Sequence, residues 1–120
     1  MDRRREFTDE RVAAFIGRYH TYMREDPDLG PLFASCVGDW DAHSARVAAY
    51  WGPALRREPT PPFPQLTPVR FGMDGPMLER WLELWNRAAD ETFAGKAAAE
   101  VQREGQEFAE EHMIGRVAGD

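Results

Sequence analysis

Two of the three histidines stand where an imidazole could do chemistry inside the protein. His43 lies in the middle of a helical stripe of apolar residues, and His20 flanks another stripe, four residues after Ile16 and three before Met23. An imidazole titrates near neutral pH, so such a pair could donate to a ligand, transfer a proton or ligate a metal. The alternative is a pair of hydrogen-bonded core histidines, because an unpartnered imidazole is costly to bury.

Aromatic side chains are the second group of residues that could form part of a functional site. Flat rings can line a site for an organic ligand, although tryptophans at helical spacing are more often plain core. We therefore expect a pocket beside the two histidines that is lined by aromatic residues and by two residues of a long loop. The expected lining is Tyr19, Tyr50, Trp51, Trp81, Trp85, Phe71 and Met73.

The other candidate residues are interpreted as structural. His112 is near a helix C-terminus, where the helix dipole favours a cation. Cys36 is the only cysteine, which excludes an internal disulfide and is consistent with a small hydrophobic role. The chain has no nucleophile-elbow serine motif, zinc-protease histidine pair, paired-cysteine motif or glycine-rich phosphate loop. Since none of these motifs is present, none of them indicates a class of reaction.

Two helices are expected to position the histidines. Residues 8–25 form the first, with Thr8 as its N-terminal cap. The second runs from Trp40 to about Leu55, with Asp39 as its cap. Its inward face is expected to comprise Trp40, His43, Val47, Tyr50, Trp51 and Ala54. A short helical segment is expected over residues 31–37.

Two further helices complete the expected all-α fold. One begins at Pro76 behind Asp74 and ends at Gly95, and the last spans roughly 96–114. Trp81 is expected to be buried between its own helix and the helix of His43. Six of the nine prolines fall in residues 59–76, which excludes a regular helix over most of that stretch. This loop, residues 56–76, is a candidate surface for a protein partner.

Composition limits the class of protein. A chain of 120 residues predicts one domain, residues 1–120. The net charge is −6, with no basic stripe beyond Arg3–Arg5, so a nucleic-acid partner is not expected. No stretch approaches the roughly 20 apolar residues of a membrane span. The N-terminus lacks a signal-peptide core, and the single cysteine suits a reducing compartment, so we expect a cytoplasmic protein.

Four motifs together resemble the truncated haemoglobins of group III. They are R-E-D-P-D-L-G-P-L-F at 24–33, D-W-D-A-H at 39–43, Y-W at 50–51 and R-W-L-E-L-W at 80–85. The resemblance extends from about Val12 to Val117. It implies a truncated-globin, two-over-two helical sandwich around haem, with His43 as the distal histidine, Trp81 as a pocket tryptophan, and a diatomic ligand.

Two departures from the family pattern concern the cofactor. The family's ligand-contacting tyrosine corresponds to His20 here, preceded by Tyr19. The family's iron-ligating histidine corresponds to Pro68, thirteen residues before Trp81, and proline has no side-chain donor. No histidine lies between His43 and His112. Haem is therefore implied by the resemblance, but its usual ligation is not expected.

Three functional hypotheses remain open, and conventional oxygen carriage is not among them. The chain is a non-canonical haem globin whose iron is held by His43, His20 or Met73. Alternatively, it is a haem-free enzyme in which His20 and His43 act as an acid–base pair or ligate a metal with a carboxylate. In the third, it is a non-catalytic partner subunit. The preferred interpretation is a globin-like ligand-binding protein with a pocket lined by His20, His43, Trp51 and Trp81.

Overall fold

Helices account for all the regular structure in the described part of the chain. The computed structural model describes residues 2–64 and 74–111. Six helices lie within these ranges: α1 (Arg3–Glu6), α2 (Asp9–Glu25), α3 (Leu29–Ala34), α4 (Trp40–Arg56), α6 (Gly75–Thr92) and α7 (Gly95–Ala109). The predicted all-α class is confirmed.

Three of the long helices begin after capping residues, of which Thr8 and Asp39 were predicted as caps. The side chains of Thr8, Asp39 and Asp74 each accept a hydrogen bond from the backbone N–H three residues further on. These bonds satisfy N–H groups that have no partner inside the helix. The caps fix where α2, α4 and α6 start, and so fix the register in which each helix presents its buried face.

The structure differs from the sequence-based expectations in its two short helices. Helix α3 begins at Leu29 instead of residue 31, because the Asp26 carboxylate accepts hydrogen bonds from two backbone N–H groups ahead of it. Helix α1 was not predicted. Residues 57–64 form no helix, whereas the rest of the proline-rich stretch, residues 65–73, lies outside the described residues.

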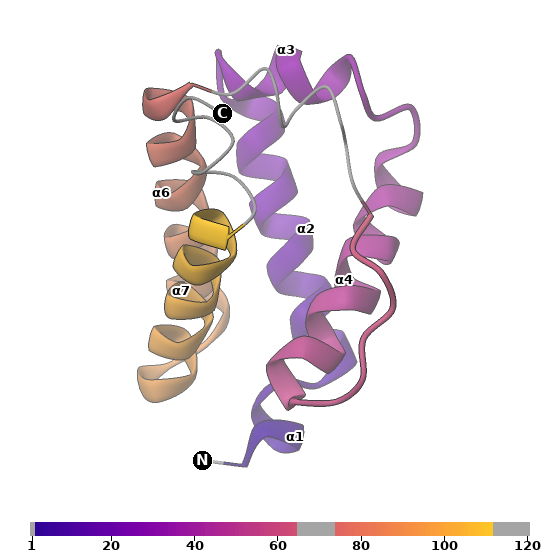
Figure 1. The fold of residues 1–120 in the computed structure, drawn as a ribbon, viewed down its shortest axis with the longest axis vertical. Helices are drawn as coiled ribbons and strands as arrows, with labels where there is room; N and C mark the ends of the chain where they lie inside the picture. The colour runs from indigo at the N-terminus through magenta and orange to yellow at the C-terminus, as the bar shows by residue number, and fades with distance from the viewer. Residues whose placement is uncertain (1, 65–73, 112–120) are drawn as a thin grey trace.

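Helix α2 lies at the centre of the arrangement (Figure 1). It packs against α4 on one side and against α6 on the other, with α3 across its C-terminal end. Helices α6 and α7 run side by side as a pair (Figure 1). The N-terminal part of α4 therefore meets the C-terminal part of α2, where the two histidines are carried.

Trp85 connects the four long helices. It is 1% exposed, and its indole contacts Phe15 of α2, Trp51 of α4 and Trp81 of its own helix, with ring centroids 4.7, 4.9 and 5.5 Å apart. Its Nε1–H donates to the carbonyl of Val101 on α7 at 2.9 Å. Burying an indole requires a partner for this donor, and the backbone of α7 supplies it.

Trp81 is buried, as predicted. It is 6% exposed, and its described ring contacts are with Tyr19 of α2 and Trp85 of α6. The described aromatic contact between α6 and α4 is made by Trp85 with Trp51. The expected place of Trp81 between α6 and α4 stays a prediction, because ring contacts alone do not test it.

Gly105 of α7 allows the close approach of the Trp85 indole. A Cβ at this position would lie 2.6 Å from Trp85 Cδ1, which is closer than van der Waals contact permits. Since Trp85 is enclosed on all sides, Gly105→Ala should lower the free energy of unfolding by about 1–3 kcal/mol, as measured by urea denaturation.

The matched control for this prediction is Gly17→Ala on α2. A Cβ at Gly17 would meet no atom within 4 Å, so the same exchange should stabilise the protein by about 0.5–1 kcal/mol. Equal stability of the Gly105→Ala variant and the unmodified protein would contradict the packing described for α6 and α7.

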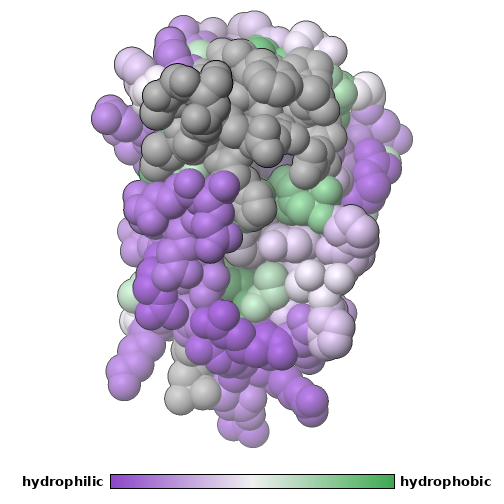
Figure 2. Space-filling model, viewed as in Figure 1, coloured by the Kyte–Doolittle hydropathy of each residue, from purple (hydrophilic) through white to green (hydrophobic). Residues whose placement is uncertain are grey.

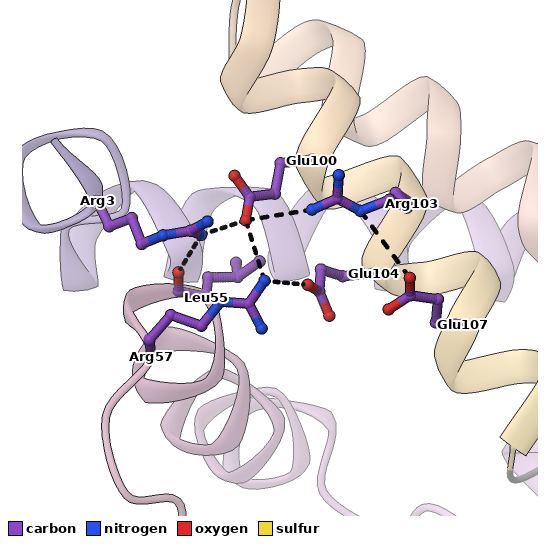
Figure 3. Close-up of polar contacts among 7 residues, drawn as sticks. All are labelled: Arg3, Leu55, Arg57, Glu100, Arg103, Glu104 and Glu107. Carbon is purple, nitrogen blue, oxygen red and sulfur yellow. Dashed lines mark hydrogen bonds and ion pairs between the residues drawn. The ribbon is translucent and has the colours of Figure 1, made fainter. Parts of the chain in front are cut away.

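A buried carboxylate of α7 connects α1 and the C-terminal end of α4 (Figure 3). Glu100 of α7 is 7% exposed, and it pairs with Arg3, with Arg57 at 3.5 Å and with Arg103 at 3.6 Å. Arg3 also donates to the carbonyl of Leu55 at 3.2 Å. A buried carboxylate needs such partners, because its desolvation alone would destabilise the fold.

The outer surface of the described residues is largely hydrophilic on the face shown in Figure 2, with small apolar areas between charged side chains. Within residues 2–64 and 74–111, no helix has both the length and the apolar character needed to cross a membrane.

Candidate functional site

The crossing of α2 and α4 brings His20 and His43 together. Their ring centroids are 5.3 Å apart and their planes are inclined by 23°, so the imidazoles stack. The two residues are 4% and 5% exposed. Trp40 presents its ring at a steep angle to both, with centroids 5.4 Å from His20 and 5.9 Å from His43. Two side chains 23 residues apart in sequence thus form one buried pair that packs against the Trp40 ring.

Ser44 holds the His20 ring in place. Its Oγ lies 2.6 Å from Nδ1 of His20, and the direction of donation depends on the imidazole tautomer. No other described residue hydrogen-bonds the His20 ring, and none hydrogen-bonds the His43 ring. The remaining ring nitrogens of the pair therefore have hydrogen-bonding capacity that the described protein groups do not use.

Both imidazoles are held in the neutral form. Burial, the neighbouring His43 and the charge of Arg24 lower the pKa of His20 to about 3. Burial and the charge of Arg46 also lower the pKa of His43. A neutral imidazole carries one N–H donor and one acceptor nitrogen, so the pair can offer both to a ligand.

Tyr19 lies directly behind the pair. Its ring centroid is 5.5 Å from that of His20, and the ring also packs edge-on against Trp81 and Trp85. The residue is 3% exposed, and its hydroxyl has no hydrogen-bond partner among the described residues. Burial raises the pKa of the hydroxyl. A buried group left unsatisfied in this way calls for a nearby water or ligand.

Tyr50 and Trp51 are two further aromatic residues expected around the site. Tyr50 and Trp51 contact each other, and Phe63 packs against Tyr50 at 5.0 Å. Phe108 of α7 contacts both Trp51 and Phe63. No described ring contact joins Tyr50 or Trp51 directly to the histidines, but Trp51 is linked to His20 through Trp85 and Tyr19. The place of Tyr50 and Trp51 in a shared pocket stays a prediction.

Several candidates cannot be placed relative to the histidine pair. Pro68, Phe71, Met73 and His112 lie outside the described residues. Cys36 is half-buried, with its Sγ 3.5 Å from the carbonyl of Leu32. Within the described ranges, no group of three or more histidine, cysteine, aspartate or glutamate side chains could hold a metal ion. The carboxylate expected as a third metal ligand is therefore not found beside His20 and His43 in that part of the chain.

Two supporting residues were missed in the sequence. Ser44 gave no signal beyond its position next to His43. Asp26 was interpreted only as the end of a helix, yet it is a buried carboxylate that ties α2 and α3 to α6. It accepts from the backbone N–H of Leu29 at 3.0 Å and from Nε of Arg80 at 2.7 Å. This junction fixes the end of α2 one turn beyond His20.

The Asp26 junction predicts an acid-labile contribution to stability. Burial by itself raises the pKa of Asp26, but hydrogen bonds from Leu29, Arg80 and Asp28 outweigh it and lower the pKa below the ordinary value of 3.8. The folded state therefore favours the carboxylate. The stabilisation is present above pH 3.8 and is lost as the pH falls from there through the folded pKa.

Urea denaturation at a series of pH values, with Asp26→Asn as the comparison, measures this contribution. The variant should be less stable than the unmodified protein at neutral pH, and the difference should shrink on acidification. A difference that does not change with pH would show that the carboxylate charge contributes nothing.

Comparisons with known proteins agree with the fold and the motifs. No family model matches the sequence. A curated protein described as "Group 3 truncated hemoglobin ctb", from Campylobacter jejuni, is 25% identical over 95 residues, which cover 66% of this chain and 67% of the relative. A crystal structure of a group III truncated hemoglobin from Campylobacter jejuni superposes with a TM-score of 0.70 at 22% identity, covering 88% of each chain. The chain has a truncated-globin fold, and the matches support a relationship to the group III truncated haemoglobins.

Proposed function

We propose that this chain is a globin-fold protein that binds a small polar ligand at His20 and His43, without a haem held in the conventional way. The observation that carries the proposal is the stacked, buried histidine pair, whose ring nitrogens are only partly used by described residues. Core histidines that serve only the fold are expected to satisfy their nitrogens within the protein.

Binding fits this pair better than acid–base catalysis. A general base is most effective when its pKa lies near the working pH. The pKa of His20 is about 3, so its imidazole would be a weak base in neutral solution. A neutral ring fixed by Ser44 is suited to hydrogen bonding with a ligand, because its orientation is set before the ligand arrives.

The donor set does not fit conventional haem ligation. Haem is the group that the fold family implies. The two described histidines come from adjacent helices, and their rings stack on each other instead of lying on opposite sides of a macrocycle. Pro68 corresponds to the family's iron-ligating position, and no histidine lies between His43 and His112. We therefore propose no oxygen carriage and no chemistry at iron for this chain.

Nitrogen-15 NMR of the histidine side chains tests the proposal. Three probes of nearly identical shape are titrated into the labelled protein: formate, formamide and formamidinium. At least one should shift the ring signals of both His20 and His43 in a saturable way. If no probe changes either ring while the protein stays folded, the proposed site is refuted.

A further inference from the structure

Each histidine of the pair is followed by an arginine one turn later on the same helix. Arg24 follows His20 by four residues on α2, and Arg46 follows His43 by three on α4. Residues at these spacings lie on the same side of a helix. Both arginines are exposed, and neither forms an ion pair with a described residue, whereas several other arginines do, such as Arg3 and Arg80.

Arg24 is connected to the histidines through Trp40. Its guanidinium carbon lies 5.0 Å from the centroid of the Trp40 ring, and Trp40 contacts both imidazoles. The charge of Arg24 acts on His20, and that of Arg46 acts on His43, in both cases lowering the pKa. No carboxylate contributes to the pKa of either ring. The charged side chains that shift the pKa values of the two imidazoles are therefore positive.

The backbone adds to this positive environment. Trp40 is the first residue of the 17-residue helix α4, and the N-terminus of a helix carries a partial positive charge. His43 is 5% exposed and its imidazole has no hydrogen-bond partner among the described residues, so it is a buried polar side chain near this helix end. The carboxylates of Asp39, which caps α4, and of Asp41 lie at the same end of the helix and offset part of this charge, so the anion preference rests on the two arginines.

We propose that the ligand of the histidine pair is a small, singly charged oxyanion of carboxylate-like shape, attracted by Arg24 and Arg46 and hydrogen-bonded by imidazole N–H groups. The proposal rests on the ligand-binding function proposed above. An anion gains from both arginines, whereas a neutral molecule of the same shape gains only the hydrogen bonds.

The same three probes test this selectivity, because they differ in charge and hardly in shape. Formate should bind about tenfold more tightly than formamide, and formamidinium should bind most weakly. Arg24→Gln and Arg46→Gln should each weaken formate binding by about three- to tenfold and leave formamide binding unchanged. Added salt should weaken formate binding in the unmodified protein.

Arg5→Gln on α1 is the matched control, since it removes the same charge at the opposite end of α2 (Figure 1). It should leave the affinity for formate unchanged. Formamide or formamidinium binding as tightly as formate would overturn the anion proposal while leaving a ligand site at the histidines. An equal effect of Arg5→Gln and Arg24→Gln would also overturn it. If all three probes fail to shift the rings, the site itself is refuted and the anion proposal with it.

Discussion

His20→Phe and His43→Leu should each abolish binding of formate while leaving the helical fold intact. Each substitution removes both ring nitrogens and replaces the imidazole by an apolar side chain that can remain buried. Replacing a buried polar group by an apolar one is close to neutral for stability when no partner is stranded. For His20 the stranded partner is Ser44, whose hydroxyl can turn to a carbonyl of its own helix.

The measurement combines the NMR titration with circular dichroism of each variant. Ser44→Ala is the matched control, because it keeps both imidazoles and removes only the hydrogen bond that orients His20. It should weaken binding without abolishing it. If a folded His43→Leu variant binds formate as well as the unmodified protein does, the histidines have a purely structural role and the prediction is wrong.

Trp81→Ala should lower the free energy of unfolding by about 3–5 kcal/mol, which is the range for truncating a buried tryptophan. The indole is 6% exposed and packs against Tyr19 and Trp85, so its removal opens a void between α2 and α6. Since Tyr19 also contacts His20, this variant should disturb the histidine pair as well.

Urea denaturation measures this loss, and Trp81→Phe serves as the control. Phenylalanine keeps an aromatic ring against Tyr19 and should lose clearly less stability than alanine. A loss below about 1 kcal/mol for Trp81→Ala would mean that the site collapses around the void, or that Trp81 is not part of the core.

Local signals in the sequence were enough to predict the four long helices. Thr8, Asp39 and Asp74 are capping residues at positions where an apolar periodicity begins, and each caps a helix in the structure. The periodicity also placed His43 on a buried face. These features depend only on neighbours within a turn or two, so they can be found without knowing how the helices pack.

Features that depend on the packing of distant segments could not be predicted in this way. The pairing of Arg3 with Glu100 joins residues 97 positions apart. The choice of Trp85 over Trp81 as the contact to Trp51 depends on how far α6 is rotated against α4. Both are consequences of tertiary packing, which the periodicity of one helix does not specify.

The histidine pair shows the same limit within the site. The stripes predicted that His20 and His43 face inward, and family resemblance suggested that they share a pocket. The bond from His20 to Ser44 and the stack under Trp40 follow from the angle at which α2 crosses α4. The roles proposed for Pro68, Phe71 and Met73 stay predictions from sequence, because these residues lie outside the described ranges.

The most direct test of the account is the visible absorption spectrum of the purified protein before and after titration with haem. The purified protein should be largely colourless and should show no sharp Soret band at one equivalent of added haem, because Pro68 supplies no donor and the two described histidines stack on each other. A strong Soret band at near-stoichiometric haem, lost in His20→Phe or His43→Leu, would contradict the account and assign the pair to iron ligation.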